Sequence, residues 1–434
     1  MNRHVVIAGG GFGGYYTAKG LERMLDPEVR ITMVSDVNFM LYTPLLPGAA
    51  AGTLEPRHVV VPLREHLRRT ELRLGWVTGA DPLERTLAVH QLSGDDVELR
   101  YDQLVVALGS VSRTFPIPGL AEHGMGFKTI SEAIALRNRL VRCLETAEET
   151  DDEDMRRQHL GFVFVGAGYA GLEGIAELQD FAVDALPRYP RCTATGMRWV
   201  LVEAGSRVMP GIQPQLAQFA TELMRERGID VRLETQLTEV TPTSVTLSTG
   251  ETIPCRTVCW TAGVRGNPIA ERLGLPLSQG RIRVRDTMQV EGFDDVWALG
   301  DIAAVPDPAR PGQPAPPTAQ HAIRQGKLMA RNVAGALRGE PPRPFTFKTL
   351  GVFADLGRHK AVANLMGLRV KGLLAWSVGR LYHLAWIPGM RHKVRLLIDW
   401  SVEFLFERDT AELGALGHPP SLVEHPAPPA QVPG

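Results

Sequence analysis

Short apolar runs alternate with longer amphipathic segments along most of this chain. Two of the runs, at 5–8 and 161–165, lead directly into a cluster of glycines and then into a helical pattern, at 15–25 and 172–185. Because strands that alternate with helices build parallel sheets, this pattern predicts an α/β fold. Further strand patterns lie at 198–204, 229–233 and 244–248, and a further helical pattern at 215–227.

Both glycine clusters have the spacing G-x-G-x-x-G between a strand pattern and a helical one. The first glycine allows a tight turn, the second lets the backbone approach a pyrophosphate, and the third lets helix and strand pack closely. Unpaired N–H groups at the helix start then attract the phosphates. Two such clusters predict two bound dinucleotides. The residues assigned to them are Gly9, Gly11, Phe12, Gly13 and Gly14 in the first, and Gly166, Gly168, Tyr169 and Gly171 in the second.

An acidic residue at the end of the next strand would hold the adenosine ribose of each nucleotide. Glu203 follows the strand pattern after the second cluster. Its carboxylate would accept from both ribose hydroxyls and repel a 2′-phosphate, which favours NADH over NADPH. The alternative is a surface carboxylate at a strand end. After the first cluster Asp36 comes one place later than usual, behind Ser35. We expect Asp36 to reach the ribose, with Ser35 as the weaker alternative.

Composition narrows the class of protein further. A chain of 434 residues predicts two or three domains, and the net charge of -1 gives no indication of a nucleic-acid partner. The four cysteines show no C-x-x-C spacing, so neither a disulfide framework nor a metal site is expected. A strand pattern begins within three residues of Met1, and no uncharged run exceeds 18 residues. We therefore expect no signal peptide, no transmembrane helix and a cytoplasmic location.

Two more strand patterns end in small residues that bear on the first nucleotide. One closes with Ala107 and Gly109, and the other with Gly300 and Asp301. With these segments the chain resembles the flavoproteins that have two dinucleotide-binding domains. The resemblance implies that Asp301 binds the ribityl chain of the flavin, that FAD occupies the first cluster and that NADH occupies the second. The alternative for Asp301 is a helix cap.

Three segments narrow the resemblance to type II NADH dehydrogenases, the single-subunit NADH:quinone oxidoreductases. They are residues 38–52, the W-T-A-G-V run at 260–264 that contains Ala262 and Gly263, and the P-P-T-A-Q run at 316–320. The resemblance extends over most of the chain, from residue 4 to residue 410. It implies FAD as cofactor, NADH as substrate and a membrane quinone as electron acceptor, without proton pumping.

The resemblance also implies roles for single residues. Gln320 would orient the quinone, and Glu173 would lie near the stacked nicotinamide and flavin, unless it is a surface or a buried, paired glutamate. Arg324 stands where the family pattern has a second glutamine, and Leu108 where it has a threonine. Arg324 could still donate to a quinone carbonyl, but this exchange leaves the electron acceptor open.

Residues 369–398 carry six basic residues and no acidic one. Apolar residues recur there at helical spacing up to residue 405, and tryptophans are frequent. Such a pattern suits helices that lie on an anionic membrane surface, where each basic residue contributes about 1 kcal/mol. The alternative is a pair of helices that packs on the protein or on a second subunit, as in a homodimer. The resemblance favours a peripheral protein on the cytoplasmic side of the cell membrane.

The predicted architecture is α/β, with an inserted NAD(H)-binding domain in an FAD-binding domain, both Rossmann-like, and a C-terminal membrane-associating helical segment. The boundaries are 1–118 and 290–345 for the FAD domain, 119–289 for the NAD(H) domain, 346–410 for the C-terminal region and 411–434 for a disordered tail.

Three other functions compete with NADH:quinone oxidoreduction. A soluble NAD(P)H-dependent flavin reductase would pass electrons to a protein such as ferredoxin. A disulfide reductase or sulfide:quinone oxidoreductase needs cysteines near the flavin, and the first 142 residues contain none. A non-enzymatic redox sensor could bind both nucleotides, although the segment that resembles a quinone site argues against it.

Overall fold

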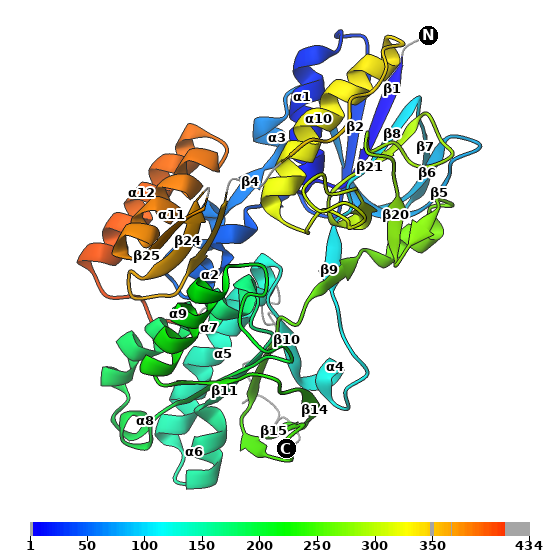
Figure 1. Ribbon diagram of the computed structural model, residues 1–434. Helices are drawn as coiled ribbons and strands as arrows, with labels where there is room; N and C mark the ends of the chain where they lie inside the picture. The colour runs from blue at the N-terminus through cyan, green and yellow to red at the C-terminus, as the bar shows by residue number, and fades with distance from the viewer. Residues whose placement is uncertain (1–2, 348–350, 366, 413–434) are drawn as a thin grey trace, which may run out of the picture.

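The computed structural model describes residues 3–347, 351–365 and 367–412. Its larger sheet has seven strands in the order β21-β8-β1-β2-β5-β6-β7. The strands from β21 to β5 are parallel, and β5, β6 and β7 form an antiparallel meander. Helices α1 and α10 pack against each other beside this sheet (Figure 1). The bounds are β1 His4–Ala8, β2 Arg30–Ser35, β5 Glu71–Asp81, β6 Thr86–Gln91, β7 Asp96–Arg100, β8 Gln103–Val106, β21 Val296–Ala298, α1 Phe12–Met24 and α10 Ala319–Leu337.

The second sheet has five parallel strands in the order β10-β17-β11-β12-β13. Its central strand β11 is buried along its whole length, as expected for a parallel strand covered on both faces. A small antiparallel sheet, β14-β15-β16, contributes the core on one of those faces. The bounds are β10 Gly124–Gly126, β11 Gly161–Val165, β12 Arg198–Val202, β13 Ile229–Arg232, β14 Leu237–Val240, β15 Ser244–Leu247, β16 Thr252–Pro254, β17 Thr257–Trp260, α5 Ile130–Glu149, α7 Tyr169–Ala185 and α9 Pro214–Glu226.

The second sheet is an insertion into the first unit. The chain leaves the larger sheet after β8, builds the smaller one, and returns to place β21 beside β8. The outgoing and returning connections, β9 (Ser110–Ser112) and β18 (Val264–Gly266), pair with each other as antiparallel strands. Figure 1 shows the two sheets in separate lobes with β9 between them. The predicted α/β fold with two nucleotide-binding units is therefore confirmed.

The return to the first unit comes earlier in the chain than the predicted boundary at residue 289. Leu273, Ile282 and Met288 pack in the core of the larger sheet. Strand β20 (Arg281–Arg283) pairs with β22 (Ala303–Ala304), which follows β21. We therefore propose that the nicotinamide unit ends at β18; the other boundaries stay predictions.

The C-terminal region forms a three-stranded antiparallel sheet followed by two helices, and it contacts both units. Strand β23 lies against α7, and α12 lies against the turn η2 of the first unit. Arg369 and Lys371, which we expected in the membrane-associating segment, lie on β25, so the helical part begins only at Leu373. The bounds are β23 Gly351–Asp355, β24 Ala361–Leu365, β25 Leu368–Gly372, α11 Leu373–Trp386, α12 Met390–Leu405 and η2 Pro56–His58.

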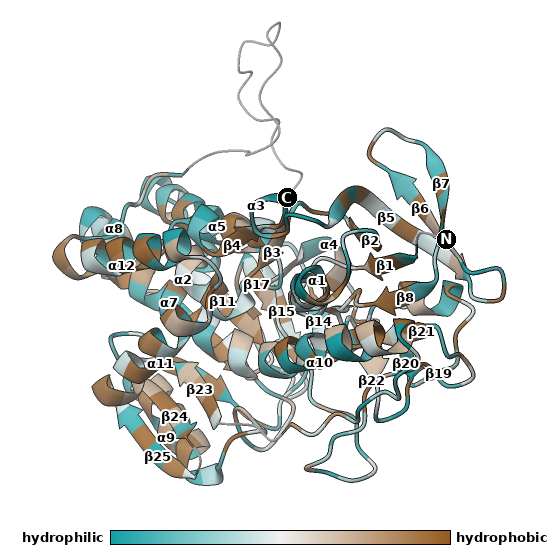
Figure 2. Ribbon diagram, turned by 90° about the horizontal axis from the view of Figure 1, so that it is seen from above, coloured by the Kyte–Doolittle hydropathy of each residue, from teal (hydrophilic) through white to brown (hydrophobic). Residues whose placement is uncertain are grey.

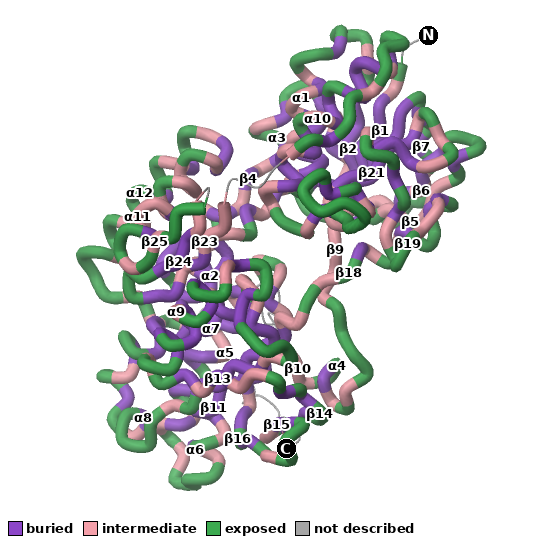
Figure 3. Tube along the Cα trace, viewed as in Figure 1, coloured by how far each residue is buried: buried purple, intermediate pink, exposed green. Residues whose placement is uncertain are grey.

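Both C-terminal helices expose much of their apolar surface. Leu374 and Leu381 of α11 and Ile398 of α12 are more than half exposed. Figure 2 shows hydrophobic residues in brown on these helices at the edge of the molecule, and Figure 3 shows both helices largely outside the buried core. No helix in the described part of the chain is long and apolar enough to span a bilayer.

After α12 the chain runs back along the nicotinamide unit. The Arg137 guanidinium donates to the carbonyl of Ala411 at 2.7 Å and to that of Asp409 at 2.5 Å. Of the tail predicted to be disordered, Ala411 is thus held through its carbonyl and Glu412 through an ion pair with Arg142, and residues 413–434 lie outside the described part. The remaining elements are β3 Phe39–Leu41, β4 Val60–Pro62, β19 Leu277–Ser278, α2 Leu46–Ala50, α3 Leu63–His66, α4 Leu120–His123, α6 Glu153–His159, α8 Pro190–Thr195, η1 Thr43–Leu45, η3 Leu186–Arg188, η4 Pro268–Arg272 and η5 Gly300–Ile302.

Candidate functional site

The two glycine turns have closely similar local geometry. Gly9 and Gly166 have φ values of +111° and +101°, a region that glycine alone adopts readily. A Cβ on Gly14 would lie 1.8 Å from the carbonyl oxygen of Gly9, and one on Gly171 would lie 1.9 Å from that of Gly166. Glycine is therefore required at the first and last position of each cluster, because helix and strand meet there without room for a side chain.

The middle glycines differ from the others because nothing lies beside them. A Cβ on Gly11 or on Gly168 would meet no atom within 4 Å. Each is the N-cap of its helix, makes no side-chain capping bond and is followed by no acidic residue in the first turn. Unsatisfied N–H groups beside open space are what a pyrophosphate binds at a helix N-terminus. Both turns therefore have the chemistry to bind a dinucleotide.

The first residue of each helix is aromatic: Phe12 begins α1 and Tyr169 begins α7. In α1 the next residue is Gly13. The Phe12 ring packs edge-on against Tyr42, with 5.6 Å between the ring centroids. A Cβ on Gly13 would lie 3.1 Å from a methyl carbon of Leu299, so this glycine too serves close packing. The buried hydroxyl of Tyr169 has no hydrogen-bond partner in the protein, and burial raises the pKa of Tyr169 to about 12.

The strand ends beside the two turns carry different side chains. In the strand registers Val34 pairs with Ala8 and Val202 with Val165, so Ser35, not Asp36, occupies the position equivalent to Glu203. The Glu203 carboxylate accepts from the backbone N–H of Ala167 at 2.7 Å and that of Gly205 at 2.7 Å.

The hydroxyl of Ser35 is buried without a partner, and Asp36 is exposed. Our preference for Asp36 as the ribose ligand followed from residue type alone. The register and the unsatisfied hydroxyl both favour Ser35.

A chain of hydrogen bonds joins the two units beside the first turn. Ser110 donates to the Asp301 carboxylate at 2.6 Å, and the ammonium of Lys128 donates to the Ser110 hydroxyl at 2.7 Å. Gly300 has a φ of +72°, and its N–H donates to the Gln325 side chain at 2.8 Å. Ala107 and Gly109 form the turn that precedes Ser110. Asp301 makes no side-chain cap of the short helix η5 that begins at Gly300, so its carboxylate is turned towards β9 instead.

Lys128 is a site residue that sequence reasoning missed. It lies just before α5 in the inserted unit, yet its ammonium reaches the first unit through Ser110. Burial lowers the pKa of Lys128, and the charge of Asp301 opposes that effect. No local sequence signal marks Lys128, because Ser110 lies 18 residues before it and Asp301 lies far after it in the chain.

The run from Trp260 to Gly263 closes over the second turn. The Thr261 hydroxyl donates to the carbonyls of Val165 at 2.9 Å and Gly166 at 2.8 Å. A Cβ on Gly166 would lie 2.7 Å from the Cα of Ala262. Gly263 has a φ of +96° and open space at its Cβ position. The run is thus fixed to the glycine turn by hydrogen bonds, and the space beside Gly263 is not filled by protein atoms.

Gln320 and Arg324 lie one turn apart on α10, facing the C-terminal region. The Gln320 side-chain N–H donates to the carbonyl of Gly351 at 3.1 Å, and its amide oxygen is buried without a partner. The Arg324 guanidinium lies 4.2 Å from the centroid of the Phe347 ring and 4.9 Å from that of Trp386. Burial lowers the pKa of Arg324. These cation–π contacts hold the guanidinium in the place where the family pattern has an uncharged amide.

An aromatic cluster beside these residues was also missed. The Tyr42 hydroxyl lies 3.4 Å from Nδ1 of His383 on α11, and the ring of Phe353 packs on the same histidine. Burial lowers the pKa of His383 to about 4, so the imidazole is neutral at physiological pH. The cluster combines residues from three distant segments, so no single stretch of sequence predicts it.

Glu173 lies at the contact between α7 and β23. Its carboxyl accepts from the backbone N–H of Asp355 at 3.0 Å, and burial raises its pKa well above the ordinary value. Of the alternatives for Glu173, the structure therefore excludes the surface glutamate. Its predicted place beside the nicotinamide and flavin stays a prediction.

The cysteines offer no redox pair. All four are buried and free, and burial raises the pKa of Cys192 and of Cys255 to about 12. A buried thiol with a raised pKa is a poor nucleophile, which removes the main requirement of a disulfide reductase. Among the described residues no group of histidine, cysteine and carboxylate side chains could hold a metal ion.

The chain has one glycine turn in each of two units, and one unit is inserted in the other. This arrangement is that of a pyridine-nucleotide-dependent flavoprotein. The chain matches the pyridine nucleotide-disulphide oxidoreductase family over residues 3–326. Within that class it belongs to the type II NADH:quinone oxidoreductases.

Several relatives support this assignment. The chain is 31% identical to the type II NADH:quinone oxidoreductase Ndh of Mycobacterium tuberculosis, over 94% of this chain and 89% of that protein. It is 30% identical to a probable NADH dehydrogenase of Dictyostelium discoideum, over 94% and 91%. It is also 31% identical to the demethylphylloquinone reductase NdbB of Synechocystis, over 91% and 95%.

Solved structures share the fold. NDH2 from Plasmodium falciparum in complex with NADH superposes with a TM-score of 0.87 at 18% identity, over 95% of this chain and 100% of that chain. A ferredoxin reductase from Rhodopseudomonas palustris reaches a TM-score of 0.67 at 25% identity, over 83% and 82%. The Plasmodium structure therefore covers a larger share of this chain than the ferredoxin reductase does.

Proposed function

We propose that this protein oxidises NADH through bound FAD and reduces a membrane quinone, without pumping protons. The observation that carries the proposal is the pair of equivalent glycine turns, each with open space and free N–H groups at a helix N-terminus. Membership of the type II NADH:quinone oxidoreductases supports the assignment of FAD and NADH to the two turns.

The residues around the first turn fit FAD. Gly11 leaves room for the pyrophosphate, and the unpaired hydroxyl of Ser35 is available to a ribose. The Asp301 carboxylate, fixed by Ser110, would accept from the ribityl hydroxyls. Bound FAD would accept a hydride from NADH and release two electrons to the quinone.

The residues around the second turn fit NADH. Gly168 leaves room for the pyrophosphate, and Glu203 stands at the end of β12 with its carboxylate fixed by two backbone N–H groups. A fixed carboxylate repels a 2′-phosphate, so it favours NADH over NADPH. Ala262 packs against this turn, and Gly263, with open space at its Cβ position, would leave room for the nicotinamide.

Gln320 and Arg324 would orient the quinone. The Arg324 guanidinium is fixed between aromatic rings with N–H donors to offer to a quinone carbonyl. The amide oxygen of Gln320, which has no partner in the protein, would accept from a hydroxyl of the reduced quinone. A cation at this place would stabilise negative charge that develops on the quinone oxygen.

Docking on the membrane would follow from the exposed apolar faces of α11 and α12. Arg391 and Arg395 are exposed beside those faces and would attract anionic lipids. The protein would lie as a peripheral protein on the cytoplasmic side of the cell membrane. The same surface could instead serve a homodimer, a possibility that flotation with lipid vesicles separates from membrane binding.

The test is NADH oxidation by the FAD-loaded protein with a short-chain quinone or with ferricyanide as acceptor. We expect turnover with both acceptors, and Gln320→Leu to lower kcat/KM for the quinone by about 100-fold, the loss expected for a misplaced substrate. Ferricyanide, which needs no quinone site, should still be reduced by that variant. Turnover with ferricyanide alone in the wild type would mean that the acceptor is another molecule, such as a ferredoxin.

A further inference from the structure

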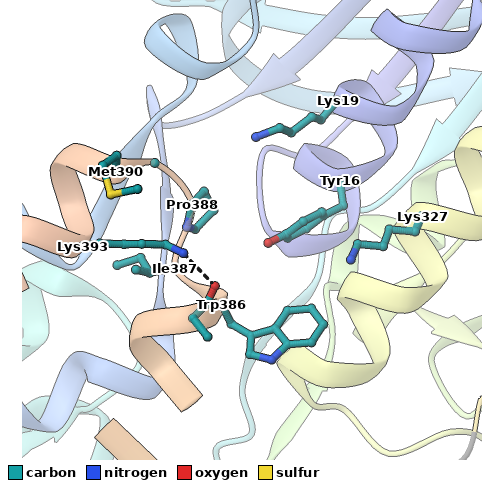
Figure 4. Close-up of a pocket in the computed structure, with 10 residues that line it drawn as sticks. Tyr16, Lys19, Lys327, Trp386, Ile387, Pro388, Met390 and Lys393 are labelled. Atoms are coloured by element: carbon teal, nitrogen blue, oxygen red, sulfur yellow. Dashed lines mark hydrogen bonds between the residues drawn. The ribbon is translucent and has the colours of Figure 1, made fainter. Parts of the chain in front are cut away.

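A cavity of about 490 Å³ lies between the first unit and the loop that joins α11 to α12. Its walls include Tyr16 and Lys19 of α1, Lys327 of α10, and Trp386, Met390 and Lys393 of the C-terminal region. Figure 4 shows Lys19, Tyr16 and Lys327 on one wall and the C-terminal residues on the other. Neither Gln320 nor Arg324 lines it, although its wall residue Trp386 also contacts Arg324, so it adjoins the proposed quinone contacts without including them.

The three lysines of this cavity form no ion pair with any described carboxylate. The ammonium of Lys19 donates to the Tyr15 hydroxyl at 3.0 Å, and that of Lys393 donates to the Ala385 carbonyl at 3.0 Å. The ammonium of Lys327 lies 4.9 Å from the centroid of the Trp386 ring. Their partners are neutral groups, so the positive charge in the cavity is uncompensated.

The charge of Glu22 acts on Lys19 and opposes the lowering of its pKa by burial, but the two side chains form no ion pair. Glu22 lies one helical turn from Lys19, but its carboxylate already accepts from the backbone N–H groups of Arg69 and Thr70 and from the Thr70 hydroxyl, at 2.8 to 2.9 Å. Among the residues that line the cavity none is acidic. An anion from outside is therefore the natural partner for the three ammonium groups.

The charges around the cavity also favour a bound anion. Burial, together with Arg23, lowers the pKa of Lys19. Burial and the neighbouring Arg324 and Arg331 lower the pKa of Lys327. A bound anion would relieve this repulsion between like charges.

The cavity is also partly apolar and lies beside exposed hydrophobic side chains. Ile387 and Pro388 contribute to its wall. Met390 at its edge is 73% exposed, and Val394 on the next turn of α12 is 48% exposed. A ligand that carries hydrocarbon next to its anionic group would fit these walls better than a free anion.

We propose that this cavity binds the phosphate of an anionic glycerophospholipid, with Lys19, Lys327 and Lys393 around the headgroup. The hydrocarbon chains would pass over Pro388 and Met390 into the bilayer. The proposal rests on the membrane docking of α11 and α12 proposed above. It adds a defined headgroup site in which two of the three cations come from the first unit.

The test uses the full-length, FAD-loaded protein and dihexanoyl-phosphatidylglycerol below its micelle concentration, with calorimetry as readout. We expect binding of this lipid and none of dihexanoyl-phosphatidylcholine at the same concentration. The double variant Lys19→Gln/Lys327→Gln should weaken binding by about 30-fold, which corresponds to two cations at about 1 kcal/mol each.

The matched control is Arg391→Gln/Arg395→Gln. It removes the same charge from exposed residues of α12 that do not line the cavity. It should weaken binding of the monomeric lipid by no more than about twofold, while both double variants weaken binding to phosphatidylglycerol vesicles. Equal loss of the monomeric lipid in both variants would mean general surface attraction and would overturn the proposal.

Two further results would also overturn it. Inorganic phosphate that binds as tightly as the lipid would identify a free-anion site. A raised KM for short-chain quinone in the lysine variant, with unchanged lipid affinity, would identify a quinone entrance. NADH oxidation by ferricyanide should stay unchanged in every variant, so a lost lipid site is distinguishable from failure of the proposed redox function.

Discussion

The two nucleotide-binding units share a turn but differ in what surrounds it. At equivalent strand ends the second unit has Glu203, held by two backbone N–H groups, and the first has Ser35, with a buried hydroxyl that no protein group satisfies. A ligand that comes and goes suits a site whose polar groups are satisfied without it. A ligand that stays bound can complete one that is unsatisfied. Turn geometry therefore identifies a dinucleotide site, whereas the strand end indicates which nucleotide that site holds.

The largest effects are expected when each turn is blocked by the same substitution. Gly11→Val and Gly168→Val place a side chain where the cofactors are proposed to lie, and both positions have ordinary φ values of -71° and -70° with open space. We expect Gly11→Val to lose FAD, and Gly168→Val to retain FAD but to bind NADH at least about 100-fold more weakly, or about 2.7 kcal/mol.

Flavin absorbance after gel filtration and NADH titration measure the two effects. Circular dichroism checks that both variants fold. Loss of FAD from the Gly168→Val variant alone would reverse the assignment of the nucleotides.

A smaller effect is expected at the strand ends. Glu203→Gln removes the charge that repels a 2′-phosphate, so the preference for NADH over NADPH should fall by about tenfold, within the Coulomb energy available at a partly exposed site. Ser35→Ala is the matched change in the first unit. It should leave this preference unchanged and weaken FAD binding instead. The preference is measured as the ratio of steady-state kcat/KM with NADH to that with NADPH. An unaltered ratio in the Glu203→Gln variant would show that Glu203 does not select the nucleotide.

The contact between the units can be tested at Lys128. Lys128→Met removes the donor to Ser110 and a positive charge that interacts with the Asp301 carboxylate. We expect FAD affinity to fall by about tenfold, because a charged hydrogen bond contributes about 1.5 kcal/mol. Titration of the apoprotein with FAD measures this change, with Lys360→Met as a control at an exposed lysine. Unchanged FAD affinity would restrict Lys128 to a structural role.

The helix after the second turn, α7, contains a buried carboxyl group and packs beside another, and the pKa of each is raised. Helix α7 buries Glu177, whose pKa is raised to about 8, and it packs beside Asp355, whose pKa is raised to about 6; burial is the main cause for both. Folding therefore favours their protonated forms. The stability they add is complete below about pH 4 and is lost as pH rises through 6 and then 8.

Thermal unfolding checks this prediction. The Tm of the wild type should fall by about 5 °C between pH 6 and pH 9, and Glu177→Gln should reduce that fall. Arg408, 3.6 Å from the Glu177 carboxylate, limits the effect because it stabilises the charged form. A Tm that rises over this range would contradict the direction.

Local signals in the sequence were enough to predict the turns and most strands of both sheets. Glycine spacing reports directly on backbone geometry, so the positions of Gly9 and Gly166 were found without a structure. The ribose side of the first unit was harder, because residue type favoured Asp36 and only the register of β2 against β1 places Ser35 there. Strand registers depend on contacts between distant segments, which one sequence does not reveal.

The parts of the site that were missed come from several segments at once. Lys128, Tyr42 and His383 meet their partners only after the two units and the C-terminal region have packed. In the C-terminal region, periodicity predicted the helices but not the preceding strand β25, which carries two of the cations assigned to the membrane-associating segment. A short, half-exposed strand shows too little apolar alternation to be recognised.

The pairing of β9 with β18 has a mechanical consequence. Each strand connects the two units, and together they form a two-stranded ribbon instead of two independent tethers. Twisting one lobe against the other would shear the hydrogen bonds of this ribbon, such as those from the Arg113 N–H to the Gly263 carbonyl at 3.0 Å and from the Asn267 N–H to the Gly109 carbonyl at 3.1 Å. The ribbon therefore resists torsion while it still permits bending, so the lobes can open and close along one direction without losing their alignment.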